Sequence, residues 1–321
     1  MFENKIDLTV VANSIAKIKD EVRKIIVGQE TMIELLLASI LADGHVLIEG
    51  VPGVAKTLTS KVLARTISAD FSRLQFTPDL MPSDVIGVSV FNQKTTEFDF
   101  KKGPVFSNIV LIDEINRAPA KTQAALFEVM EERQITVDGA TYAMEPPFMI
   151  LATQNPIDQE GTYRLPEAQL DRFLFKIVVG YPDAEEEFLI LKEAHQNGSK
   201  ADLSKVVPVL SKQEIKEIRE AVQKIHVEDH LIRYIASIIQ ETRSNASLYL
   251  GASPRASVAI LRAAKAIAAI RGRDFVTPED IQEVVYPVLE HRVVVTAEKE
   301  MEGTTVGMVL KEIIKKIEVP R

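Results

Sequence analysis

The strongest candidate for chemistry is the segment of residues 50–57, with the sequence GVPGVAKT. It follows an apolar run at residues 45–49 and precedes a stretch with helical periodicity, which is the strand–loop–helix context of a phosphate-binding loop. In such a loop, backbone N–H groups and the helix N-terminus present partial positive charge to a phosphate. Lys56 is then placed to reach the β- and γ-phosphates, and the Thr57 hydroxyl to ligate Mg²⁺. The strict pattern has glycine where this chain has Ala55, and a Gly/Pro turn that happens to precede Lys-Thr is the plainer alternative.

Two adjacent acids end a second apolar run. Residues 109–112 are IVLI, and Asp113 and Glu114 follow directly. Ligands of an open α/β sheet bind at the carboxyl ends of its strands, so both carboxylates are predicted to lie near the phosphate loop. We expect Asp113 to hold Mg²⁺ through water and Glu114 to polarise an attacking water. Taken alone, the pair also fits a solvated strand end.

Three further polar residues lie at the ends of other predicted elements. Asn155 could orient the lytic water or contact the γ-phosphate, although Asn-Pro is also a turn signal. Arg172 immediately precedes an apolar run and fits either catalysis or a surface ion pair with Asp171. Arg255 lies in the first turn of a predicted helix, where a cation opposes the helix dipole unless a phosphate lies nearby. An exposed side chain that extends away from the helix end is the alternative for Arg255.

A parallel sheet is the element that would bring these residues together. The first two thirds of the chain alternate apolar runs, typical of buried strands, with amphipathic helical stretches. This alternation predicts an α/β fold, with helices on both faces of a parallel sheet. Strands are expected at residues 45–49, 109–112, 148–151 and 173–179, and helices at 31–42, 57–68, 120–132 and 184–196.

Two segments interrupt this alternation. Residues 77–106 carry prolines and glycines around a strand-like run, and residues 134–143 place Asp138-Gly139 between two alternating runs, which is a strong hairpin signal. Beyond residue 211 the pattern is helical, with helices expected at 212–224, 228–243, 254–271 and 278–289. Residues 197–202 are the expected linker, so we predict two domains, residues 1–196 and 197–321.

The composition excludes several classes of function. The 321 residues include 38 Lys and Arg against 46 Asp and Glu, for a net charge of −8, which argues against a dedicated nucleic-acid binder. The sequence has no cysteine, which excludes disulfides, thiolate metal sites and cysteine nucleophiles. No apolar run approaches the roughly 20 residues of a membrane helix, so we expect no export signal, no membrane insertion and a cytoplasmic location.

Together these motifs resemble those of the MoxR family of AAA+ ATPases. The resemblance rests on VGQ at 27–29, GVPGVAKT at 50–57, LIDEIN at 111–116, ATQNP at 152–156, PEAQLDRF at 166–173 and GASPRA at 251–256. These motifs span nearly the whole chain, and their combination is far more specific than any one of them. The resemblance implies a P-loop AAA+ core with a five-stranded parallel sheet and a C-terminal all-α lid domain.

The resemblance also implies a role for each motif residue. Asn155 resembles sensor 1, Arg172 an arginine finger that reaches the neighbouring subunit, and Arg255 sensor 2. Residues 77–106 resemble the helix-2 insert and residues 134–144 the pre-sensor-1 hairpin, and an N-terminal helix is expected before them. Glu114 is implied as the catalytic glutamate of the Walker B pair, with Thr57 and Asp113 as the metal ligands. The implied nucleotide-binding residues are Val27, Gly28, Gln29, Gly50, Pro52, Gly53, Val54, Ala55, Lys56, Thr57 and Leu58.

The implied function is hydrolysis of ATP to ADP and phosphate by a ring of subunits, with a hexamer expected. Hydrolysis would remodel or activate a client or adaptor protein, often one with a von Willebrand factor A domain. Two alternatives stay open from the sequence: a nucleotide-dependent interaction scaffold with negligible turnover, and a DNA-directed AAA+ ring. Glu114 and Arg172 favour hydrolysis over a scaffold. The acidic balance disfavours DNA, although Lys101, Lys102 and Arg133 make the two insertions locally basic.

Overall fold

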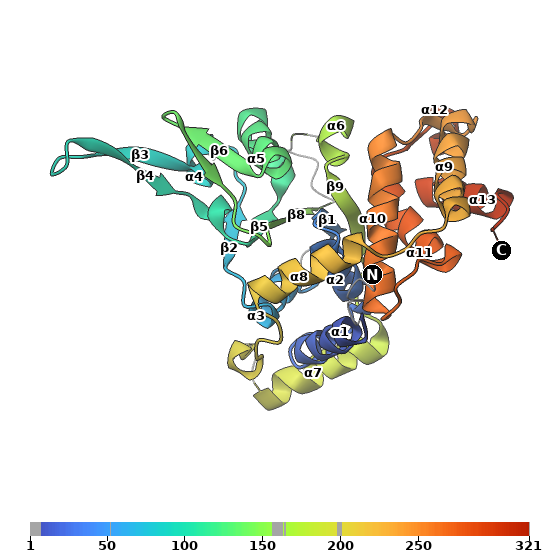
Figure 1. The fold of residues 1–321 in the computed structure, drawn as a ribbon, viewed down its shortest axis with the longest axis horizontal. Helices are drawn as coiled ribbons and strands as arrows, with labels where there is room; N and C mark the ends of the chain where they lie inside the picture. The colour runs from blue at the N-terminus through green and yellow to red at the C-terminus, as the bar shows by residue number, and fades with distance from the viewer. Residues whose placement is uncertain (1–7, 52, 156–162, 164, 198–200, 321) are drawn as a thin grey trace, which may run out of the picture.

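The computed structural model describes residues 8–51, 53–155, 163, 165–197 and 201–320 (Figure 1). Its centre is a five-stranded sheet with the strand order β2-β5-β8-β1-β9. Every neighbouring pair of strands in this sheet is parallel. The strands are β1 (His45–Gly50), β2 (Phe71–Gln75), β5 (Ile109–Asp113), β8 (Met149–Gln154) and β9 (Phe173–Val179). The predicted α/β class with a parallel five-stranded sheet is confirmed.

The residue pattern predicts four of these five strands and misses β2. The four are rich in buried apolar side chains, as expected for strands that are covered on both faces. β2 lies at one edge of the sheet, and Leu74 is its only buried residue. An edge strand with one buried side chain lacks the apolar run by which the other strands are found.

Helices cover both faces of the sheet. Successive side chains of β1 point to opposite faces and pack against different helices. Val46 and Ile48 belong to a hydrophobic cluster with α1 (Leu8–Arg23), α2 (Glu30–Leu41) and α3 (Lys56–Thr66). Leu47 points the other way, into a second cluster with α5 (Ala120–Glu132). The sheet is thus the middle of three layers.

The two predicted insertions are both antiparallel hairpins (Figure 1). The first consists of β3 (Gly87–Asn92) and β4 (Glu97–Lys102), and α4 (Pro82–Ile86) precedes it. The second consists of β6 (Gln134–Val137) and β7 (Ala140–Ala143). Asp138 and Gly139, with φ of 51° and 78°, form the predicted two-residue turn. The hairpins contact each other, because the Ser89 hydroxyl donates to the Asp138 carboxylate and the rings of Phe100 and Tyr142 lie 4.7 Å apart.

The C-terminal third is helical, as predicted, apart from a small antiparallel pair of strands. After α6 (Glu167–Leu170) and α7 (Ala184–Asn197) come α8 (Lys212–Gln223), α9 (Asp229–Ser244), β10 (Leu248–Leu250), α10 (Pro254–Ile270), α11 (Pro278–Leu289), β11 (Val294–Val295), α12 (Ala297–Met301) and α13 (Val306–Lys316). Each helix predicted from the sequence is present, with its ends within two residues of the predicted ones. The boundary at residue 197 stays a prediction, since part of the linker lies outside the described residues. Within the described ranges, no helix is both long and apolar enough to cross a membrane.

Candidate active site

The predicted phosphate-binding loop joins β1 to α3 at the carboxyl edge of the sheet. α3 begins at Lys56, so Lys56 and Thr57 occupy its first turn, where backbone N–H groups are free to bind an anion. Ala55 is the N-cap and lies in the left-handed region, with φ 57°. The strict motif has glycine here because glycine adopts this conformation without strain. The Lys56 ammonium donates to the Gly50 carbonyl oxygen at 2.6 Å and so spans the loop.

The rest of the loop is anchored by apolar side chains and leaves its backbone open. The Val54 side chain is buried in the core, and Leu58 packs against the same cluster. Gly53 has a φ of 92°, and nothing lies within 4 Å of the position that a Cβ would take. A ligand could therefore approach the backbone at Gly53 closely. Pro52, predicted to be part of the site, lies outside the described residues.

β5 brings the two acids to the same edge of the sheet, and both neighbouring strands hold Asp113. The Asp113 side chain accepts a hydrogen bond from Arg73 Nε of β2 at 2.6 Å and another from the Thr153 hydroxyl of β8 at 3.2 Å. The Thr153 oxygen in turn accepts from the backbone N–H of Glu114 at 3.0 Å. Asp113 is only 8 % exposed. Its carboxylate therefore has a fixed orientation.

Glu114 has an unusual backbone and two side-chain partners. Its φ and ψ of 57° and 53° lie in the left-handed region, which is uncommon for a residue with a side chain. The carboxylate accepts a hydrogen bond from Gln75 Nε2 at 2.7 Å and forms an ion pair with Arg117 at 3.1 Å. The side chain that would polarise water is thus held by neighbours from β2 and from its own turn.

Lys56 and both acids act on each other electrostatically. Burial lowers the pKa of Lys56 below its ordinary value, and the carboxylates of Asp113 and Glu114 act in the opposite direction. The structure therefore brings together the loop lysine and the acid pair, as the sequence predicts. Asn155 follows β8 and is half-buried at the same edge.

The segment Val27, Gly28 and Gln29 joins α1 to α2 and has a constrained backbone. Gly28 has a φ of 67°, and a Cβ at this position would overlap the Glu186 carboxylate of α7. Gln29 is the N-cap of α2, with φ 60°. This segment is the one expected to contact adenine.

Arg172 and Arg255 lie together at the opposite edge of the sheet. Arg172 precedes β9, whereas the phosphate loop follows β1, its parallel neighbour. β1 has six residues, and at about 3.3 Å per residue roughly 17–20 Å separate its two ends. The structure therefore does not bring either arginine to its own chain's phosphate loop.

One carboxylate of α5 binds both arginines. Glu131 accepts from Arg172 Nη1 at 2.6 Å and from Arg255 Nη2 at 2.8 Å. The alternative of a surface ion pair between Arg172 and Asp171 is thus wrong, because the Asp171 carboxylate binds Arg292 and Ser253 instead. Glu131 also offsets the repulsion between Arg255 and the dipole of α10.

The two arginines line a cavity of about 500 Å³ with an excess of cations. Five arginines against three acids border it: Arg133, Arg172, Arg255, Arg262 and Arg292, with Asp43, Glu131 and Asp171. A concave surface of this kind suits an anionic ligand or an anionic group of another chain.

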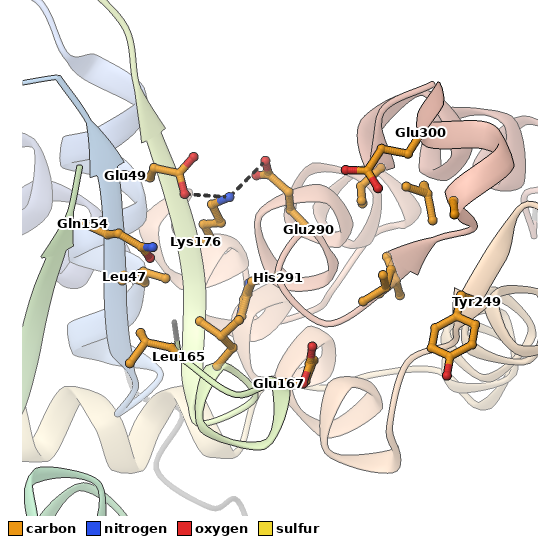
Figure 2. Close-up of a pocket in the computed structure, with 16 residues that line it drawn as sticks. Leu47, Glu49, Gln154, Leu165, Glu167, Lys176, Tyr249, Glu290, His291 and Glu300 are labelled. Carbon is orange, nitrogen blue, oxygen red and sulfur yellow. Dashed lines mark ion pairs between the residues drawn. The ribbon is translucent and has the colours of Figure 1, made fainter. Parts of the chain in front are cut away.

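A second cavity, of about 750 Å³, separates the sheet from the C-terminal helices (Figure 2). On one wall, Lys176 of β9 lies between two carboxylates, with Nζ 3.0 Å from Glu49 and 3.7 Å from Glu290. Burial raises the pKa of Glu290, while the Lys176 ammonium acts in the opposite direction. Glu49 directly precedes Gly50, so this ion cluster connects the start of the phosphate loop with the C-terminal helices.

The residue pattern does not reveal the partners that orient the acids and the arginines. Arg73 and Gln75 belong to β2, the strand that the apolar pattern does not reveal. Arg117 carries a usable signal, because it lies three residues after Glu114 and could turn back onto it. Glu131 carries none, since it is one of several acids near the end of α5.

Comparisons with known proteins agree with this architecture. Residues 45–175 match the ATPase family associated with various cellular activities (AAA), and residues 240–313 match the AAA lid domain. The chain is 44 % identical to the chaperone MoxR1 of Mycobacterium tuberculosis over 310 residues, which are 94 % of this chain and 81 % of that protein. It is 45 % identical to the uncharacterised protein YeaC of Bacillus subtilis over 95 % of both chains.

More distant relatives and a solved structure point the same way. The protein MoxR of Paracoccus denitrificans is 31 % identical, over 84 % of this chain and 85 % of that protein. A crystal structure of a candidate ATPase from Cytophaga hutchinsonii is 44 % identical, with a TM-score of 0.91 over 98 % of this chain and 97 % of that one. From this similarity along its whole length, the chain belongs to the MoxR family of AAA+ ATPases.

Proposed function

We propose that this ATPase hydrolyses ATP to ADP and phosphate with Mg²⁺, in a ring whose active sites are each shared by two subunits. The observation that carries the proposal is the convergence of Lys56, Asp113 and Glu114 at the carboxyl edge of the sheet, beside the N-terminus of α3. An anion there meets the helix dipole, the loop N–H groups and a partly buried ammonium. These features all favour a bound polyphosphate.

The residues around Asp113 fit Mg²⁺. The Thr57 hydroxyl offers a direct oxygen ligand, which Mg²⁺ prefers, and the Asp113 carboxylate would hold the ion through water. Mg²⁺ commonly takes only one or two ligands from the protein beside phosphate and water. Among the described residues, no group of three or more His, Cys, Asp or Glu side chains could hold a metal. When bound, the ion would neutralise charge on the phosphates.

Glu114 and Asn155 are proposed to act on the attacking water. The Glu114 carboxylate is half-exposed at the end of β5 and accepts hydrogen bonds, as a group that polarises water must. Asn155 lies at the end of the adjacent strand β8 and would orient the same water or the γ-phosphate. Gln75 and Arg117 hold Glu114 in the present arrangement, so the carboxylate must exchange these partners for water before catalysis.

Arg172 and Arg255 are proposed to act on the nucleotide of a neighbouring subunit. They lie at the edge opposite to their own phosphate loop, within a cavity that has an excess of cations. An edge-to-edge contact between two chains would place this cavity against the neighbour's phosphates. Such a contact is heterologous and forms a ring when its rotation closes, and we propose a hexamer.

The partner is proposed to be a client or adaptor protein, with von Willebrand factor A domains as the expected class. The relative MoxR1 is named a chaperone, and the two hairpins extend from the sheet where a partner could contact them (Figure 1). A DNA-directed role has less support, because Arg133 faces inward: it pairs with Asp43 at 3.0 Å and donates to the Phe148 carbonyl. We place this activity in the cytoplasm.

Two substitutions test the assignment of the nucleotide site. Lys56→Ala is expected to abolish ATP binding, since Lys56 contacts the phosphates in the ground state. Glu114→Gln should keep ATP binding and lose turnover, because only the polarisation of water is removed. Binding of a fluorescent ATP analogue and release of phosphate measure the two effects. Normal turnover by Glu114→Gln would show that another residue activates the water.

A mixture of variants tests the shared site. Arg172→Ala should bind ATP normally and lose most hydrolysis, and Lys56→Ala alone should be inactive. In a ring assembled from equal amounts of both, about a quarter of the interfaces join an intact Lys56 to an intact Arg172. Phosphate release should therefore recover to about a quarter of the wild-type rate. No recovery in rings shown to be mixed would place Arg172 in its own chain's chemistry or in none.

A further inference from the structure

Three consecutive residues after α11 attach the C-terminal helices to β9. Glu290 forms the ion pair with Lys176, and His291 Nε2 donates to the Phe173 carbonyl at 2.9 Å. Arg292 follows and is 7 % exposed. Glu290 and His291 contact β9 directly, and Arg292 contacts β9 and the residues just before it. The segment 290–292 therefore has a fixed position relative to Arg172, which immediately precedes β9.

Arg292 uses every donor of its guanidinium. An arginine side chain has five N–H groups, and Arg292 donates to five oxygens. Nε donates to the Asp171 carboxylate at 2.8 Å. Nη1 donates to the carbonyl oxygens of Leu174, at 3.1 Å, and of Val288. Nη2 donates to the carbonyl oxygens of Asp171, at 3.0 Å, and of Phe173. Four of these five contacts are with residues 171–174, the segment that contains Arg172. A buried guanidinium satisfied in this way defines the backbone path on both sides of Arg172.

Asp171 extends the same network to the second arginine. One of its carboxylate oxygens binds Arg292, and the other accepts from the Ser253 hydroxyl at 3.0 Å. Ser253 is the N-cap of α10, two residues before Arg255. Asp171 therefore joins the segment that carries Arg172 to the helix end that carries Arg255, while Glu131 joins their two side chains.

We propose that Arg292 is a positioning residue that, through Asp171, sets Arg172 and Arg255 in the geometry needed to act on the neighbouring subunit's nucleotide. The proposal rests on the function proposed above, in which Arg172 acts across the interface. Arg292 borders the cavity, but its five donors are already occupied, so it is not proposed to bind the nucleotide itself. Its effect must therefore appear in the neighbour's site and not in the site of its own chain.

The substitution Arg292→Lys tests this role. Lysine keeps the charge but has three donors on one nitrogen, so it cannot reproduce the fork between the carboxylate and the carbonyls. A misplacement of about 1 Å at a catalytic group can cost 10²-fold in rate, so we expect a loss of turnover of roughly 10–100-fold. ATP binding by the same chain should stay within about twofold of the wild type, because its own phosphate loop is intact.

Three readouts separate positioning from a general structural role. Turnover should recover to about a quarter of the wild type when Arg292→Lys is mixed with Lys56→Ala, as predicted for Arg172→Ala. Adding Arg292→Lys to the double variant Arg172→Ala/Arg255→Ala should slow turnover no further, because both side chains that Arg292 positions are then already absent. Arg273→Lys is the matched control. Arg273 binds the fully buried Asp280 within the C-terminal helices and does not contact β9.

The outcomes distinguish this proposal from the one on which it rests. Normal turnover by Arg172→Ala would refute the shared site itself. Loss of turnover by Arg172→Ala, but not by folded Arg292→Lys, would refute only the role of Arg292. Loss of ATP binding by Arg292→Lys, or no recovery in mixed rings, would likewise overturn the role. If Arg292→Lys does not fold, Asp171→Asn, which keeps the side-chain volume but removes the charged acceptor, should give a smaller loss with the same recovery in mixtures.

Discussion

Gln75 offers a direct test of how Glu114 is controlled. Gln75 Nε2 donates to the Glu114 carboxylate at 2.7 Å, from β2, the strand whose Arg73 also binds Asp113. If Glu114 must leave this partner to polarise water, the hydrogen bond stabilises the resting arrangement and slows turnover. Gln75→Ala should then raise the basal rate of ATP hydrolysis.

The size of the effect follows from the strength of the bond. Hydrogen bonds to a charged group contribute about 1.5–3 kcal/mol to stability. Because the Gln75 side chain is exposed, water competes for the Glu114 carboxylate, and we expect this hydrogen bond to contribute about 0.5–1 kcal/mol. The basal rate should therefore rise about two- to fivefold. Arg117, the other partner of Glu114, remains and keeps the effect in this range.

The measurement is steady-state phosphate release at saturating ATP, with ATP affinity determined separately. Gln213→Ala is a matched control, since Gln213 donates to Glu217 at 3.0 Å on the exposed face of α8, and its removal should leave turnover unchanged. A fall in turnover of Gln75→Ala at unchanged affinity would refute the reasoning. It would show that Gln75 aligns Glu114 for catalysis and does not restrain it.

Three further predictions concern stability and the hairpins. Ala55→Gly should raise the free energy of unfolding by about 0.5–1 kcal/mol in urea titrations, because φ at this residue is 57° and glycine relieves the strain at a smaller entropic cost. Burial lowers the pKa of His45 to about 3, so a proton that the unfolded chain binds below about pH 6.5 is excluded from the folded chain. As the pH falls from 6 to 4, His45 should therefore lower the free energy of unfolding by up to about 1.4 kcal/mol per pH unit, and this contribution should be lost in His45→Gln; a substitution of the exposed His230 to Gln is the matched control. Replacing Asp138-Gly139 with two alanines should disturb the hairpin turn and its hydrogen bond with Ser89 but not the nucleotide site, so basal phosphate release persists while stimulation by a client protein is lost. A general loss of stability in thermal unfolding would instead identify the hairpin as structural packing.

The sequence predicts that residues 50–57 and the acid pair lie at one edge of the sheet, because each motif is contiguous. Residues 50–57 follow one buried strand, and Asp113 and Glu114 end another. The carboxyl ends of parallel strands lie at one edge of a sheet. The local sequence therefore predicts that the loop and the acid pair lie close together, even when the order of the strands is not known. The dependence of the Lys56 pKa on both carboxylates agrees with this placement.

Contacts between distant elements are not predictable in the same way. Arg73 and Gln75 orient the acids from β2, an edge strand with one buried residue and no apolar alternation. Glu131 binds Arg172 and Arg255 from the exposed end of α5, where any of several acids would look equivalent in the sequence. Arg292 follows a helix without a motif. Its role depends on carbonyl oxygens, which every residue possesses, and so leaves no trace in residue type.

The arrangement around Glu131 accords with the proposed shared site, in which Arg172 and Arg255 act on a neighbouring chain and not on their own. Arg172 and Arg255 share this single carboxylate, so together the three side chains carry one net positive charge. The carboxylate is partly exposed, and exposed ion pairs contribute only about 0–1 kcal/mol each. A polyphosphate from a neighbouring subunit, with several charges, would therefore displace Glu131 at little cost. We infer that Glu131 keeps the two arginines together and correctly spaced until an interface forms, while the length of β1 keeps them from the phosphates of their own chain.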